Sequence, residues 1–124
     1  MIPVSSHLTF HLYRHATDMR RHFDGLCAMV KQHLGRDPLD GDVYVFINKR
    51  RDRMKLLVWD RTGFWLFCKR LEKGTFQIPE RNADKVALQL AYEELVMILE
   101  GIDLKSVKRR PRYSRPSSHE SIRL

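Results

Sequence analysis

A basic loop between two apolar runs restricts the fold of this chain more than any other feature. Residues 43–47 and 54–59 are rich in β-branched and aromatic side chains, which favour strands. Two strands joined by so short a connection pair as an antiparallel hairpin. The connection carries four cations, Lys49, Arg50, Arg51 and Arg53. The pattern therefore predicts a hairpin with a strongly basic tip.

Further short strands are expected on both sides of this hairpin. Alternating apolar and polar residues predict one strand over residues 8–12, and residues 64–68 and 75–78 have the composition of two more. Turn residues join the four strands from residue 43 onward closely, which is typical of an antiparallel meander. The sequence thus predicts an antiparallel sheet of about five short strands.

Two segments have the patterns of helices. Thr17 and Asp18 form an N-cap signal ahead of apolar residues spaced by three and four, and Gly35 is a natural stop. Residues 91–100 form the second helix, which Gly101 ends. We expect one α+β domain over residues 1–104, in which these two helices pack on the sheet.

Much of the charge lies after this domain. The chain has 23 Lys and Arg against 15 Asp and Glu, a net charge of +8, which favours a polyanionic partner such as DNA. Residues 105–124 carry seven of the cations and a single acid, among many Ser, Pro and Arg residues. Such a segment buries too little apolar surface to fold alone, so we expect a disordered basic tail.

Other features argue for a cytoplasmic protein. Cys27 and Cys68 lie in apolar settings without a metal-binding spacing, as expected of reduced thiols. We expect no signal peptide, and no apolar stretch approaches the roughly 18 residues of a membrane helix.

The cations allow two interpretations. Those of the hairpin could bind phosphates, with Arg20, Lys55 and Lys69 as weaker candidates, or could simply keep a turn soluble. Aromatic residues alternate with cations around Lys55 and Lys69 and could stack on bases, although such aromatics more often fill a core. The tail adds candidates that resemble a basic arm: Lys108, Arg109, Arg110 and Arg112.

Metal binding and catalysis have little support. His7, His11 and His15 are spaced by four, but the strand pattern there would scatter them, and no complementary ligand follows. The acids Asp18, Asp24, Asp52, Asp60 and Asp84 show no placement that would converge on a metal. Glycine-rich phosphate loops and nucleophile elbows are absent from the sequence. We therefore expect neither a metal nor a cofactor, and no enzymatic activity.

An ordered series of short phrases spans residues 17–103. The phrases are Thr17-Asp18-Met19-Arg20, Phe23-Asp24-Gly25-Leu26, Val45-Phe46, Asp52-Arg53-Met54-Lys55-Leu56-Leu57, Trp59-Asp60-Arg61-Thr62-Gly63-Phe64, Lys69-Arg70-Leu71-Glu72-Lys73-Gly74-Thr75-Phe76 and Leu99-Glu100-Gly101-Ile102-Asp103. Through them residues 1–103 resemble the TnpB-type accessory proteins of the IS66 family of bacterial insertion sequences. These proteins share only a label with the RNA-guided nucleases also called TnpB.

The resemblance implies a small accessory protein that is encoded beside a separate DDE-type transposase and is needed for efficient transposition. It implies no catalytic centre. One departure is that the last helix of such proteins often opens with Ser or Thr, whereas this chain has Leu90-Ala91-Tyr92. We expect DNA and the transposase as partners. The alternative is an adaptor that recruits the transposase through Trp59 or Trp65 without touching DNA.

Overall fold

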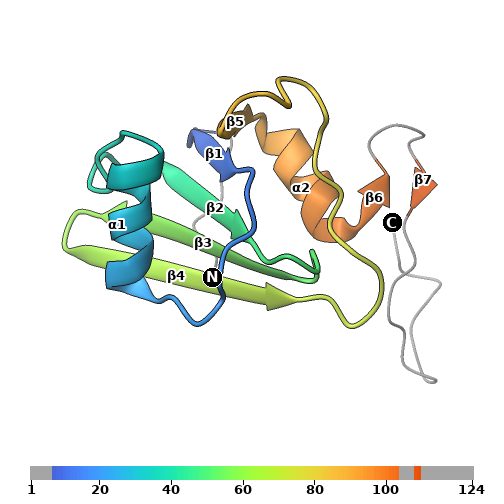
Figure 1. Ribbon diagram of the computed structural model, residues 1–124, viewed down its shortest axis with the longest axis horizontal. Coiled ribbons are helices and arrows are strands. Elements are labelled where there is room, and N and C mark those ends of the chain that lie inside the picture. The colour runs from blue at the N-terminus through green and yellow to red at the C-terminus, as the bar shows by residue number, and fades with distance from the viewer. Residues whose placement is uncertain (1–6, 104–107, 110–124) are drawn as a thin grey trace.

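A five-stranded mixed sheet with two helices forms the body of the protein (Figure 1). The structure is a computed structural model and describes residues 7–103 and 108–109. In chain order the elements are β1 (Phe10–Tyr13), α1 (Phe23–His33), β2 (Val43–Ile47), β3 (Arg53–Asp60), β4 (Gly63–Arg70), β5 (Ala87–Leu90), α2 (Tyr92–Glu100), β6 (Ile102–Asp103) and β7 (Lys108–Arg109). The predicted α+β class is confirmed.

The sheet has the strand order β4-β3-β2-β1-β5, in which β2 and β1 run parallel to each other. The hairpin of β2 and β3 and the turn from β3 to β4 are confirmed as antiparallel pairs. The prediction of a wholly antiparallel sheet is wrong, because β1 pairs parallel with β2. Parallel neighbours need a long crossover, and α1 lies within the connection that supplies it.

Each face of the sheet has its own core. Val43, Val45 and Ile47 of β2 belong to one cluster together with residues of α2, whereas Tyr44 and Phe46 belong to the other with residues of α1. Alternating side chains of one strand point to opposite faces, so the central strand is covered on both sides. Figure 1 shows α1 crossing the sheet near β3 and β4. This double burial explains the unbroken apolar run in β2.

Helix α1 begins later than predicted. The Thr17–Asp18 signal does not cap it: the N-cap position is His22, and Asp18 instead closes a tight turn by accepting the N–H of Arg20 at 2.9 Å. A short acidic side chain stabilises a turn and a helix start by the same kind of bond, so the sequence signal was ambiguous. The predicted stop is confirmed, since Gly35 adopts a φ of 62° just after the helix.

The predicted strand over residues 75–78 is wrong. This segment has no regular structure, so the meander ends at β4, and the next strand along the chain, β5, pairs with β1 at the other edge of the sheet. Phe76 is fully buried in the core cluster that contains α2, and its N–H donates to the carbonyl of Arg51 at 2.7 Å. The apolar residues of this segment therefore anchor a loop.

Helix α2 starts close to the predicted position without the Ser or Thr cap. Ala91 occupies the N-cap, and the carboxylate of Glu94 accepts its N–H at 2.9 Å. Glu94 also accepts hydrogen bonds from Arg81, and these lower the pKa of the Glu94 carboxyl below its usual value. Gly101, with a φ of 77°, ends the helix as predicted.

Of the predicted basic tail, the structure describes only Lys108 and Arg109. Strand β7 pairs antiparallel with β6, so Lys108 and Arg109 belong to a small ladder rather than to a disordered segment. Arg110, Arg112 and the rest of the predicted tail lie outside the described residues, as do residues 104–107, where the predicted domain boundary falls.

Candidate nucleic-acid interface

Asn48 closes the basic loop at the end of β2. Its side-chain oxygen accepts the N–H groups of Asp52 and Arg53, each at 3.0 Å, and its amide donates to the Asp52 carboxylate at 2.8 Å. The Asn48 carbonyl accepts the N–H of Arg51 at 3.0 Å. The Asn48 side chain thus satisfies two backbone N–H groups that a loop would otherwise leave to water.

The loop is also tied to the segment after β4. The Arg51 residue has a φ of 60°, and its carbonyl accepts the N–H of Phe76. The Asp52 carbonyl accepts the N–H of Leu71 at 2.7 Å. These bonds hold the loop backbone against its neighbours, so its cations are presented from a well-supported frame.

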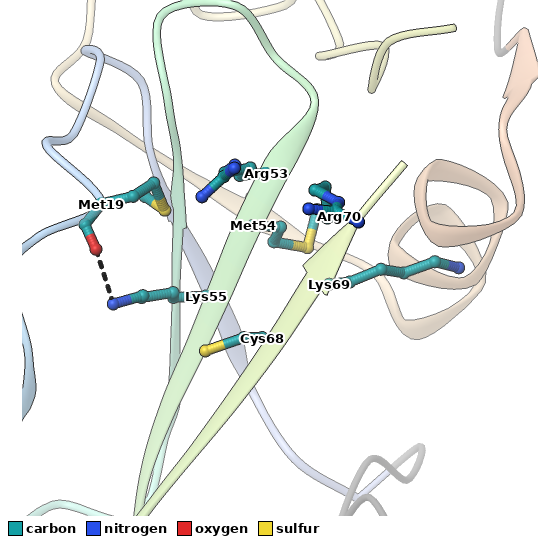
Figure 2. Close-up of a pocket in the computed structure, with 7 residues that line it drawn as sticks. All are labelled: Met19, Arg53, Met54, Lys55, Cys68, Lys69 and Arg70. Carbon is teal, nitrogen blue, oxygen red and sulfur yellow. Dashed lines mark hydrogen bonds between the residues drawn. The ribbon is translucent and has the colours of Figure 1, made fainter. Parts of the chain in front are cut away.

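Two hollows adjoin this loop. One, of about 360 Å³, is lined by Thr17, Asp18, Met19, Asn48, Lys49, Arg50, Asp52 and Arg53. The other, of about 380 Å³, is lined by Met19, Arg53, Met54, Lys55, Cys68, Lys69 and Arg70 (Figure 2). They share Met19 and Arg53, so we treat them together as the basic groove. Lys49, Arg50, Arg51 and Arg53 are exposed, as a contact surface requires.

Arg70 is a groove residue that the sequence interpretation missed. The register of β3 and β4 sets Arg53 directly opposite Arg70. Like charges opposite each other across two strands destabilise the pair. Arg70 has partial compensation, because its Nε donates to Glu72 at 2.9 Å, and its side chain is still 61% exposed. The sequence signal that could have found it is the register of β3 and β4, which the two-residue turn between these strands fixes.

Lys55 has a structural role that the sequence did not suggest. It is only 8% exposed, and its Nζ donates to the carbonyls of Met19 and Arg21 at 2.8 and 2.7 Å. Figure 2 shows the bond to Met19. These carbonyls lie in the turn segment before α1, so Lys55 fastens that segment to the sheet. The Lys55 amine is therefore engaged inside the fold and is not available to a ligand.

Replacing Lys55 with Met should lower the free energy of unfolding by about 1–3 kcal/mol, because two carbonyls lose their donor while the apolar stem stays packed. Urea unfolding would measure this loss. Lys69→Met is the matched control, since that amine also donates to a carbonyl but at an exposed site where water can replace it. A Lys55 variant with unchanged stability but weaker DNA binding would contradict the structural role.

Lys69 and Arg20 are also engaged in contacts within the protein. The Lys69 amine donates to the carbonyl of Leu99 at 2.7 Å, and Figure 2 shows its side chain extending toward α2. Arg20 pairs with Asp18 at 2.7 Å, and this hydrogen bond lowers the pKa of the Asp18 carboxyl to about 2. The Arg20 side chain remains 91% exposed. Both stay weaker candidates than the loop cations.

The aromatics and cations that alternate along β3 and along β4 do not share one face of the sheet. Leu57 packs with the α1 cluster, and Lys55 and Trp59 share its parity in β3. Trp65 lies opposite Val58, which packs with the α2 cluster. The two sets therefore lie on opposite faces of the sheet.

Of the three histidines spaced by four, one is buried in a strand and two are exposed outside it. His11 is buried in β1, bonds to Asp42 through Nε2 at 2.8 Å and stacks on the Tyr44 ring. His7 and His15 lie outside the strand and are exposed. Within residues 7–103 and 108–109, no three His, Cys, Asp or Glu residues are grouped so that they could hold a metal ion.

Sequence comparison decides the family. The family model described as "IS66 Orf2 like protein" matches residues 8–109. The chain belongs to this family. Family membership connects it with the transposition of IS66 insertion sequences, as the resemblance implied. The match extends past Asp103, so it includes Lys108 and Arg109.

Two relatives of this IS66 Orf2-like protein come from Sinorhizobium fredii (strain NBRC 101917 / NGR234). Uncharacterized protein y4jC is 38% identical over 111 residues, which cover 90% of this chain and 93% of the relative. Uncharacterized protein y4hO is 33% identical over 103 residues, 83% of this chain and 88% of the relative. No solved structure matches. No helix in the described part of the chain has the length and apolar character to cross a membrane.

Proposed function

We propose that this protein is a non-catalytic accessory factor of IS66 transposition that binds the phosphate backbone of DNA with its basic groove. The observation that carries the proposal is the opposition of Arg53 and Arg70 across β3 and β4. A phosphate between two such cations would relieve their repulsion, and charge-assisted bonds from arginine to phosphate are among the strong ones.

The neighbouring cations support the same assignment. Lys49 and Arg50 line one hollow with Arg53, Arg70 lines the adjoining hollow with Arg53, and all four side chains are exposed. The bonds from Asn48 and Phe76 support the loop backbone, so less freedom is lost when its cations meet a ligand. Contacts to phosphates carry no base information by themselves. The groove therefore supports binding of many sequences with similar affinity.

A second candidate is an adaptor that binds the transposase and leaves DNA alone. The exposed Trp65 favours it, because its side chain is 49% exposed and tryptophan is enriched at interfaces. Under this candidate the loop cations serve solubility.

Binding assays with duplex DNA and with the transposase separate the two candidates. The DNA-binding proposal predicts that the full chain binds both element-end DNA and unrelated duplex DNA, with an affinity that falls steeply as salt rises. Fluorescence anisotropy at several salt concentrations measures this. Capture of the transposase without DNA binding at low salt would support the adaptor and contradict the groove.

A further inference from the structure

Strand β4 forms one edge of the sheet, and within the described part of the chain no strand pairs with its outer side. It spans eight residues, Gly63–Arg70, and pairs one-to-one with β3 without a bulge. Natural edge strands avoid pairing with other chains through prolines, bulges or charges. Residues 63–68 contain neither a proline nor a charge. Among the described residues, this edge is therefore left open to another strand over residues 63–68.

The backbone groups that face outward can be identified. The N–H of Leu71 donates to the carbonyl of Asp52, so odd-numbered residues at this end of β4 point toward β3. Hydrogen bonding alternates along an antiparallel strand, and the two-residue turn between Asp60 and Gly63 agrees with the same phase. The free N–H and C=O groups are therefore those of Phe64, Leu66 and Cys68.

The side chains at this edge are apolar and partly exposed. Trp65 and Phe67 stack with their ring centroids 5.7 Å apart and an angle of 12° between their planes. Trp65 is 49% exposed. The opposite edge differs: β5 has four residues, and Gln89 is exposed there. An edge that combines free backbone groups with an exposed aromatic pair fits a protein partner.

We propose that β4 pairs antiparallel with β4 of a second copy, about a two-fold axis at Leu66. In this register the outward-facing groups match each other, since Leu66 meets Leu66 and Phe64 meets Cys68 of the second copy. Trp65 then lies opposite Phe67 of the second copy in a non-hydrogen-bonded pair, where side chains approach most closely. The aromatic pairs of the two copies join into one cluster.

Charge favours the antiparallel arrangement. Lys69 and Arg70 lie at one end of β4, and Asp60, which pairs with Arg61 at 3.8 Å, lies beside its other end. Antiparallel pairing brings the basic end of each copy to the Asp60–Arg61 pair of the other copy, which has no net charge. A parallel arrangement would instead place the lysines and arginines of the two copies next to each other, which is unfavourable.

The dimer would present two basic grooves at opposite ends of one continuous sheet. This consequence rests on the proposed function, whereas dimerisation itself can be tested without DNA. A particle with two separate phosphate-binding surfaces can hold two duplexes together.

Sedimentation equilibrium of the full chain without DNA tests the dimer. The mass of the parent protein should rise from one copy to two as its concentration rises. Trp65→Lys should weaken dimerisation about 30-fold or more, because it removes a central aromatic contact and introduces a charge. Cys68→Pro should do the same while the pair with β3 stays intact, since this N–H faces outward.

Gln89→Lys, on the opposite edge, is the matched control and should dimerise like the parent. Circular dichroism reports whether each variant is folded, and two independent variants guard against the failure of one. A parent that stays monomeric up to millimolar concentration would overturn the proposal. Dimerisation of both folded β4 variants at the parent's affinity would also overturn it. A parent protein that forms the dimer but does not bind DNA would contradict the proposed role of the basic groove and leave the dimer standing.

Discussion

Reversing the charges of Arg50 and Arg53 should lower the affinity for duplex DNA about 100-fold at low salt. Each phosphate contact changes the logarithm of affinity by roughly 0.9 per tenfold change in salt, so two lost contacts should flatten the salt slope by about 1.8. The variant is Arg50→Glu with Arg53→Glu, and anisotropy titrations at several salt concentrations measure both effects. Arg51 is left unchanged because it has a positive φ.

A matched control separates local contacts from net charge. Lys31→Glu with Lys85→Glu produces the same change in net charge at exposed positions. Lys31 lies on α1, and Lys85 lies just before β5, the strand at the opposite edge of the sheet from β4. Distant charges are largely screened at physiological salt, so this control should bind DNA nearly as the parent does. Equal losses in both double variants would show that overall charge, and not the groove, attracts DNA.

Replacing Phe76 with Ala should lower the free energy of unfolding by about 3–5 kcal/mol. The ring is fully buried beside residues of β2, β3 and α2, so its removal leaves a cavity where those elements meet. Urea unfolding followed by circular dichroism measures the loss. Where the variant remains folded, DNA binding should change little, since the bond from its N–H to the Arg51 carbonyl belongs to the backbone.

Val86→Ala provides the comparison for this experiment. Val86 lies in the same connection between β4 and β5 but is 43% exposed, so its truncation should cost less than about 0.5 kcal/mol. A loss below about 1 kcal/mol for Phe76→Ala would mean that the segment after β4 is not an anchor of the fold.

Local patterns predicted the hairpin and its neighbours well. The two apolar runs around the basic loop became β2 and β3, and the turn residues Arg61 and Thr62 led into β4 as expected. These features depend on alternation and turn chemistry over a few residues, and a sequence shows both directly. The stops at Gly35 and Gly101 were predictable for the same reason.

Longer-range choices were not visible in the sequence. Nothing local distinguishes an antiparallel β1 from the parallel strand that the structure contains, because side-chain alternation is the same for both directions. Phe76 and Ile78 have the composition of a strand, but their segment does not pair with β4 and packs on the core instead. Whether an apolar segment joins a sheet edge or packs as a loop depends on the whole fold.

By itself the sequence determined that four cations lie at a hairpin tip between buried strands, and that the chain resembles accessory proteins of IS66 elements. The tertiary structure decided which cations remain free to meet a ligand. Lys55 donates to two carbonyls from inside the fold. Arg70, which the sequence interpretation omitted, lies on β4 directly opposite Arg53 of β3. The physical reason is that the availability of a charge depends on hydrogen-bond partners distant in sequence.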